Sequence, residues 1–136
     1  MITLIEYLIA IREYAKEIHY HAHGESFYGI HLLMDRVADG LYDTIDKIKE
    51  VYYLGDITDS PKASELLKVA AAYIPEVTSS NEQNIRNLGD LIAKTLDHIE
   101  NEYSLDPALQ NRATNAILDA ISEDLKLKRG LIWKNV

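Results

Sequence analysis

The chain has 136 residues, of which 47% are hydrophobic, so we expect one domain with its own core over residues 1–136. It contains no cysteine, which excludes a disulfide framework and a thiolate metal site and leaves histidine and carboxylate as the strong metal ligands. The net charge of −8 argues against tight nonspecific DNA binding through the surface as a whole. No apolar run reaches the roughly 20 residues that cross a bilayer. Charged residues interrupt the apolar N-terminal segment, so we expect a cytoplasmic protein without a signal peptide.

Apolar residues at spacings of three and four predict a first helix from about Thr3 to His23, ended by Gly24. A second, longer helix is predicted to open at Ser26 and to run to about Gly55. Its apolar stripe continues without interruption over six turns and consists of Ile30, Leu33, Val37, Leu41, Ile45, Ile48 and Tyr52.

The connection that follows contains a short helix, for which Ser60 is the expected N-cap and Pro61 the first residue. Pro75 closes this segment, because proline cannot continue a helix. A third long helix is predicted to begin after Ser79 or Ser80, either of which can cap it.

Asp106 and Pro107 predict the N-cap and first residue of a fourth long helix, which Gly130 ends near Arg129. No strand pattern or repeat is present. Four long helices with a short helix in the second connection predict an all-α protein, a four-helix bundle.

On a continuous second helix, one polar stripe covers about a third of the circumference and consists of His31, Asp35, Asp39, Tyr42, Asp46 and Glu50. The usual meaning of such a stripe is a solvated acidic face. Two pairs within it, His31 with Asp35 and Asp46 with Glu50, are spaced i,i+4 and so place two possible ligands one above the other. His31 and Asp46 lie about 22 Å apart along a helix, so the two pairs cannot share an ion within one chain.

An antiparallel copy of the same helix would bring the two pairs together. Residues 31 and 50, and likewise 35 and 46, are symmetric about position 40.5, where Ala38 and Gly40 permit close approach. Such a two-fold contact is isologous and creates two equivalent sites per dimer. His19 could complete each site, and this set of imidazole and carboxylate ligands suits Fe(II).

The other histidines are interpreted differently. His21 and His23 are expected at the C-terminal end of the first helix, where the helix dipole favours them. His98 is expected on the surface of the third long helix. No Glu-x-x-His motif exists, so an intrachain di-iron site like that of the larger ferritins is not expected.

One run of residues resembles the Dps family of mini-ferritins. It begins with the pair His19-Tyr20 and continues through Gly24 and Phe27. The second histidine, His31, follows twelve residues after the first. Acidic residues then lie four, fifteen and nineteen positions after His31, at Asp35, Asp46 and Glu50. The family has a tryptophan where this chain has Tyr20.

The resemblance implies a ferritin-like bundle that assembles from antiparallel dimers into a hollow dodecamer. It implies an iron ferroxidase centre of two metal ions at each dimer interface, with His19, His31 and Asp35 from one subunit and Asp46 and Glu50 from the other. The implied reaction is oxidation of Fe(II), preferably by hydrogen peroxide, with storage of ferric mineral and protection against oxidative damage.

Acidic entry pores are also implied, for which Asp119, Glu123 and Asp124 are candidates. Many members bind DNA through a basic N-terminal tail, but here the first helix is expected to begin almost at Met1, so we do not expect DNA binding. The alternative is a helical oligomer that binds metal without redox turnover.

Overall fold

The computed structural model describes all residues 1–136 and contains helices without any strand. The α-helices are α1 (Ile2–His21), α2 (Phe27–Ala38), α3 (Leu41–Ile48), α4 (Ala63–Tyr73), α5 (Asn81–His98) and α6 (Arg112–Trp133). Two π-helical turns, η1 (Lys49–Leu54) and η2 (Ile99–Tyr103), extend α3 and α5, and a short 3₁₀ turn, η3 (Pro107–Leu109), precedes α6. The predicted all-α bundle is confirmed.

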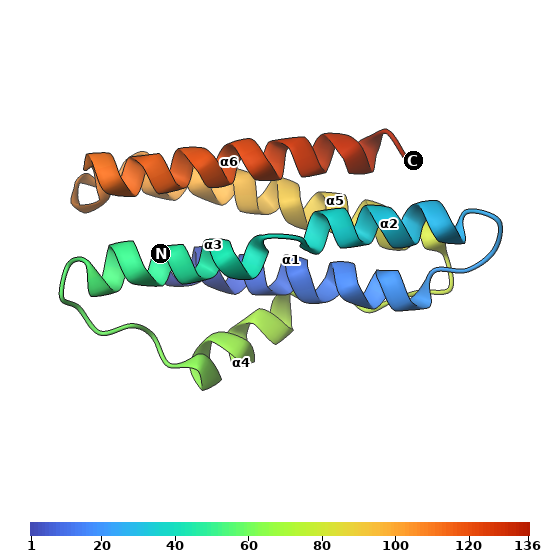
Figure 1. Cartoon of the computed structure of the whole chain (residues 1–136), viewed down its shortest axis with the longest axis horizontal. Coiled ribbons are helices and arrows are strands. Elements are labelled where there is room, and N and C mark those ends of the chain that lie inside the picture. The colour runs from blue at the N-terminus through green and yellow to red at the C-terminus, as the bar shows by residue number, and fades with distance from the viewer.

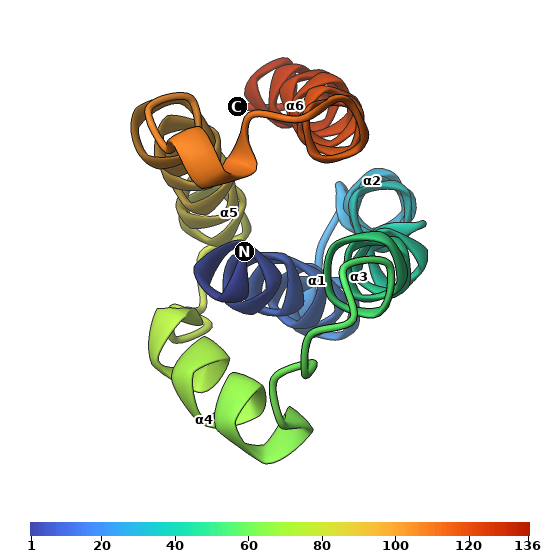
Figure 2. The same ribbon diagram turned by 90° about the vertical axis from the view of Figure 1, so that its left-hand side faces the viewer.

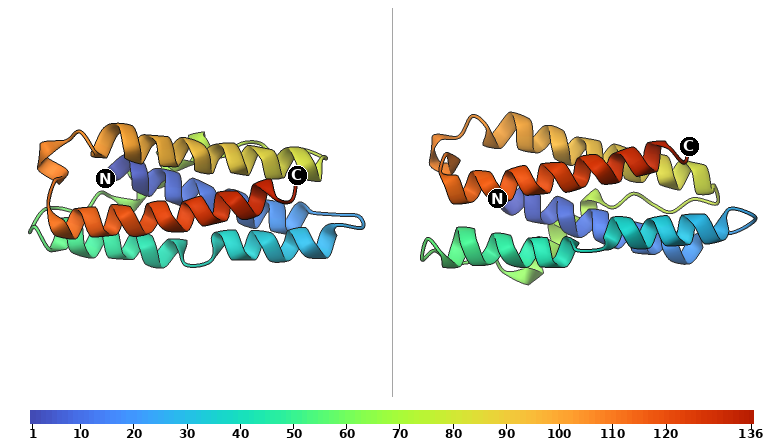
Figure 3. Two further views of the ribbon diagram at one scale, coloured as in Figure 1. Left: turned by 90° about the horizontal axis from the view of Figure 1, so that it is seen from above. Right: turned by 45° about the horizontal axis from the view of Figure 1, so that its top comes forward.

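Four long rods lie side by side in this bundle, namely α1, α2 with α3, α5, and α6 (Figure 1). α1 contacts α2, α3, α4 and α5, and α4 packs on the outside of the four rods against α1 (Figure 2). Seen from above, α6 runs along the bundle between α5 and the rod formed by α2 and α3 (Figure 3). No helix combines the length and the apolar character that a bilayer crossing requires.

The core is one continuous cluster of 32 buried hydrophobic residues, to which α1 contributes more than any other helix. Neighbours surround α1 on several sides, which explains why its apolar residues are not confined to one stripe. Tyr14 lies wholly inside this cluster, and Met34 and Leu41 bury the facing side of the α2–α3 rod.

The predicted continuous second helix is wrong at its centre. α2 ends at Ala38 and α3 begins at Leu41, because Asp39 is extended and Gly40 adopts a left-handed φ of 76°. α3 continues in the general direction of α2 (Figure 1). The apolar stripe stays buried on both sides of the break, at Val37, Leu41, Ile45 and Ile48. The Lys128 ammonium donates to the Asp39 carbonyl at 2.8 Å and satisfies a backbone group that the interruption leaves free.

The end of α1 and the start of α4 also differ from the boundaries that glycine, serine and proline predicted. α1 ends at His21, two residues before the predicted end, and Gly24 lies in the turn beyond it with a φ of 80°. α4 begins only at Ala63, so Ser60 and Pro61 are not its N-cap and first residue. The helix forms where its buried side, which includes Leu66, packs against α1.

In the second half of the chain, the predicted N-cap of α5 is confirmed, whereas the predicted start and end of the last helix are both wrong. Ser80 caps α5 by accepting a hydrogen bond from the backbone N–H of Gln83. Asp106 and Pro107 open only the 3₁₀ turn, and Asn111 caps α6. α6 also continues past Gly130 to Trp133.

The last turn of α6 is held by tertiary packing. Ile132 is fully buried, and the Trp133 ring lies so close to Gly89 that a Cβ atom at that glycine would come within 2.8 Å of it. These contacts outweigh the low helix propensity of Gly130, which is why the predicted stop is wrong.

Candidate metal centre

Three of the predicted ligands meet where the end of α1 packs against α2. His19 lies in the last turn of α1, and His31 and Asp35 lie one turn apart on α2. One ligand atom from each of the three residues lies within 4.8 Å of the others, and this is the only such group in the chain. The antiparallel pairing of α1 with α2 therefore brings these three candidate ligands together within one chain, and we call the group of His19, His31 and Asp35 the half-site.

The two imidazoles hold each other in place through the backbone. His19 Nδ1 lies 2.9 Å from the His31 carbonyl oxygen, and His31 Nδ1 lies 3.2 Å from the His19 carbonyl oxygen. The rings stack with their centroids 3.5 Å apart. Because a carbonyl oxygen only accepts, each Nδ1 carries the hydrogen, and Nε2 keeps its lone pair in the neutral ring. Each ring is thus oriented by the backbone carbonyl of the other histidine, which leaves Nε2 as the nitrogen that can bind a metal.

Aromatic side chains flank the histidine pair. The Tyr20 ring meets the His19 ring edge-on at 5.1 Å, and the Phe27 ring lies 5.1 Å from the His31 ring. His19 is buried, whereas the Asp35 side chain is about half exposed at 49%. The half-site is therefore closed by the bundle on one side and open on the side of Asp35.

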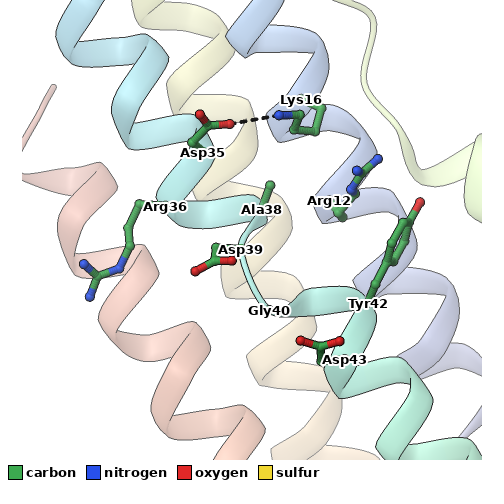
Figure 4. A pocket seen from close by; sticks show the side chains of 9 residues that line it. All are labelled: Arg12, Lys16, Asp35, Arg36, Ala38, Asp39, Gly40, Tyr42 and Asp43. Carbon is green, nitrogen blue, oxygen red and sulfur yellow. Dashed lines mark hydrogen bonds and ion pairs between the residues drawn. The ribbon is translucent and has the colours of Figure 1, made fainter.

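Lys16 is a member of this site that the sequence prediction missed. Its ammonium lies 2.8 Å from Asp35 Oδ1 (Figure 4). The hydrogen bond from Lys16 and the positive charge of its ammonium lower the pKa of Asp35, so this carboxylate is ionised at neutral pH. The available signal was spacing, because Lys16 lies three residues before His19 and so on the same side of α1.

The donor set fits a divalent cation of borderline hardness, such as Fe(II) or Zn(II). The three ligand atoms lie within 4.8 Å of one another, and ligands on opposite sides of such an ion are at most about 4.4 Å apart, so the two scales are similar. Asp35 Oδ1 also lies 3.4 Å from Nδ1 of His19, the nitrogen that carries the hydrogen. Binding of an ion through this oxygen would therefore compete with its contacts to Lys16 and His19.

Asp46 and Glu50 lie elsewhere in the chain. Asp46 is on α3 beyond the break and borders a separate apolar depression with Ile9 and Leu66, and Glu50 is in the π turn η1. The prediction that the two ligand pairs do not meet within one chain agrees with this placement.

The break itself forms an open groove of about 550 Å³ between α1 and the α2–α3 rod (Figure 4). Tyr42, which the helical wheel placed in the polar stripe, turns toward α1 here. Its hydroxyl donates to Glu13, and the Arg12 guanidinium lies 4.4 Å from its ring centroid. Tyr42 is therefore held by residues of its own chain.

The remaining histidines divide into two kinds. His21 and His23 are exposed, and only His21 lies within α1. His98 is not a surface residue as predicted, because it is half-buried and lies 3.1 Å from the Tyr103 hydroxyl. This contact spans a π-helical turn, for which the sequence offers no clear signal.

Among the candidate pore acids, Asp119 and Glu123 are exposed. Asp124 forms an ion pair with the buried Lys128 at 2.9 Å, so its carboxylate is already engaged inside the chain. The chain as a whole matches no protein-family model, no curated protein and no solved structure.

Proposed function

We propose that this chain is a subunit of a Dps-like mini-ferritin that oxidises Fe(II) with hydrogen peroxide and stores the ferric product. The observation that carries the proposal is the stacked pair of His19 and His31, whose Nε2 lone pairs are set by mutual carbonyl hydrogen bonds beside Asp35. Imidazoles fixed in this way are typical of metal ligands. The all-α bundle, with its short helix between the second and third long rods, supports a ferritin-like architecture.

The missing ligands are proposed to come from a second subunit. Asp46 and Glu50 lie on the far half of the rod whose near half carries His31 and Asp35. A two-fold axis near Gly40 would bring the far half of one rod to the near half of the other.

The surface around the half-site supports such a contact. Large hydrophobic side chains near it are exposed and form no part of the core, namely Tyr20, Phe27, Tyr28 and Leu32. Exposed apolar residues gathered in one region mark interaction surfaces. Burying them against a second copy would also exclude water from the open side of the half-site.

In this reaction iron is the substrate. Two Fe(II) ions supply two electrons to one hydrogen peroxide molecule, which takes up two protons and leaves as two water molecules. Because both electrons are delivered together, no hydroxyl radical is released. His19 and His31 bind through Nε2, and the carboxylates of Asp35, Asp46 and Glu50 stabilise the added charge of Fe(III).

The proposed assembly is a cytoplasmic dodecamer built from antiparallel dimers, without DNA as a partner. Twelve chains of 15.4 kDa give about 185 kDa. Light scattering after size exclusion would measure this mass. A monomer or an isolated dimer over a wide concentration range would remove the storage cavity and with it the mineral store.

Subunit mixing tests the shared centre directly. His31→Ala and Asp46→Asn should each abolish most of the Fe(II) oxidation rate measured by stopped-flow absorbance with hydrogen peroxide. Asp43→Asn removes an exposed acid on the same helix and serves as the matched control that keeps the rate.

When the two inactive chains are unfolded and refolded together, half of the dimers are mixed, and each mixed dimer regains one intact centre. About a quarter of the wild-type rate should therefore return. No recovery in mixed oligomers of normal mass would contradict a centre shared between subunits. Full rates in both single variants would contradict the assignment of these residues.

A helical oligomer that binds metal without redox turnover is the second candidate. Lys16 favours it, because its ammonium already neutralises the one carboxylate of the half-site. In that case the protein would bind Zn(II) through His19 and His31 but would leave the rate of Fe(II) oxidation unchanged.

A further inference from the structure

A second group of ionisable side chains lies at the opposite end of α1 from the candidate metal centre. It consists of Tyr7, Tyr73, His98 and Tyr103, which come from α1, α4, α5 and η2. Tyr7 and Tyr103 are buried, whereas Tyr73 is partly exposed. The proposed ferroxidase reaction uses none of them.

Two hydrogen bonds define the state of Tyr103. Its oxygen lies 3.3 Å from the backbone nitrogen of Leu4 and 3.1 Å from Nε2 of His98. The Leu4 N–H can only donate, so the phenolic oxygen accepts there. The buried phenolic hydrogen also needs an acceptor, and Nε2 of His98 lies within reach, so we assign the Tyr103 O–H as the donor to His98. His98 Nε2 is then the nitrogen without a hydrogen. Tyr103 thus has a proton acceptor in direct contact inside the protein.

The π turn η2 creates this pair. An α-helix places residues three and four apart on the same side, but a π-helical turn closes through residues five apart. His98 and Tyr103 are five apart and face each other edge-on, with ring centroids 4.9 Å apart. Isolated π turns of this kind occur frequently at functional sites.

Further rings connect the pair to the surface. The His98 ring lies 5.6 Å from the Tyr7 ring, and the Tyr7 ring stacks on that of Tyr73 at 4.4 Å. The series therefore leads in short steps from the buried Tyr103 to a partly exposed tyrosine. Such spacing suits the passage of an electron between aromatic rings.

We propose that Tyr103 is a redox-active tyrosine that gives up an electron to one-electron oxidants while its phenolic proton moves to His98. The O–H bond of Tyr103 breaks and an N–H bond forms at Nε2 of His98. The electron reduces the oxidant, for example a hydroxyl radical to hydroxide. The products are a neutral tyrosyl radical and an imidazolium.

Burial is the physical reason for the pairing with a base. A buried phenol that lost an electron but kept its proton would be a cation in a medium of low polarity, which is costly. Transfer of the proton to an adjacent neutral imidazole removes the charge from the phenol. One electron from a small one-electron reductant such as ascorbate, passed through Tyr73 and Tyr7, would reduce the tyrosyl radical while the imidazolium of His98 returns its proton to the phenolic oxygen. This activity would absorb oxidising equivalents and does not depend on the metal centre.

The test uses the full-length, metal-free protein and a one-electron oxidant, hexachloroiridate(IV), with freeze-quench electron paramagnetic resonance. The wild type should form a neutral tyrosyl radical that is absent from Tyr103→Phe. Tyr42→Phe, which removes an exposed tyrosine outside the group, should leave the yield unchanged. Circular dichroism checks that each variant is folded.

His98→Gln keeps a hydrogen-bond acceptor but removes the base, so oxidation of Tyr103 should slow by about tenfold or more and its rate should become less sensitive to D₂O. Two results would overturn the proposal. One is an equal radical yield in folded Tyr103→Phe, and the other is an unchanged rate and isotope effect in His98→Gln. Because no metal is present, failure here is distinguishable from failure of the ferroxidase proposal.

Discussion

Replacing Lys128 by methionine tests whether a buried ammonium holds the break in the α2–α3 rod. The Lys128 side chain is 4% exposed and donates to the Asp39 carbonyl at 2.8 Å and to Asp124 Oδ2 at 2.9 Å. Methionine has a similar length and preserves the packing of the aliphatic stem, but it supplies neither hydrogen bond. The substitution therefore isolates the polar contribution.

The expected loss follows from these two contacts. A hydrogen bond to or from a charged group contributes about 1.5–3 kcal/mol. Asp124 is 45% exposed, so water can replace Lys128 there, while the Asp39 carbonyl loses its only side-chain partner. Removal of a buried charge offsets part of the loss. We expect the free energy of unfolding to fall by about 1–3 kcal/mol.

Guanidinium unfolding followed by circular dichroism, at one fixed protein concentration, would measure this change. The midpoint should fall while the slope stays the same, because the surface exposed on unfolding is unchanged. Lys126→Met, an exposed position on the same helix, is the matched control and should alter stability by less than about 0.5 kcal/mol. If Lys128→Met loses no more stability than Lys126→Met, the ammonium does not stabilise the break.

Three further outcomes are expected. Lys16→Met frees the carboxylate of Asp35 and should tighten Zn(II) binding in isothermal titration calorimetry, whereas Lys94→Met, at an exposed position, should not. Equal Zn(II) affinities in the two variants would contradict competition by the Lys16 ammonium. Gly40→Ala should cost about 1 kcal/mol in guanidinium unfolding, because φ is 76° there, whereas Gly130→Ala, which has open space inside α6, should add about 0.5–1 kcal/mol. Burial lowers the pKa of His98, so the unfolded chain takes up a proton first as the pH falls below about 6.5, and the free energy of unfolding decreases. His98→Gln should therefore flatten the dependence of the free energy of unfolding on pH between about pH 7 and 5. An unchanged dependence would contradict this linkage.

Local signals were sufficient for much of the secondary structure. The apolar spacing predicted the long helical segments, Pro75 follows the end of α4, and Ser80 caps α5 as expected. Each of these features depends on residues within a few positions of one another. Ser60 and Asp106 are residue types that favour N-caps, but neither one caps a long helix here. The residues that follow them do not form a long helix with a buried face at that point.

The candidate site was predictable only in part. Spacing alone selected His31 and Asp35 as a pair and separated them from Asp46 and Glu50. His19 was expected near the end of the first helix as a residue that could complete the site, and the resemblance assigned it to the same subunit as His31. The orientation of both rings was not predictable, because each is set by a backbone carbonyl on the neighbouring helix.

The sequence by itself determined an acidic, cysteine-free, all-helical chain whose ligand pairs cannot meet within one rod. The tertiary structure alone decided where that rod breaks and which groups face the ligands. Lys128 reaches Asp39 from 89 positions away, and Lys16 reaches Asp35 across a helix interface. Helical periodicity is a short-range property of the backbone and can place Lys16 on the same side of α1 as His19. The partners themselves meet only after the helices have packed, so the contacts cannot be predicted from local spacing alone.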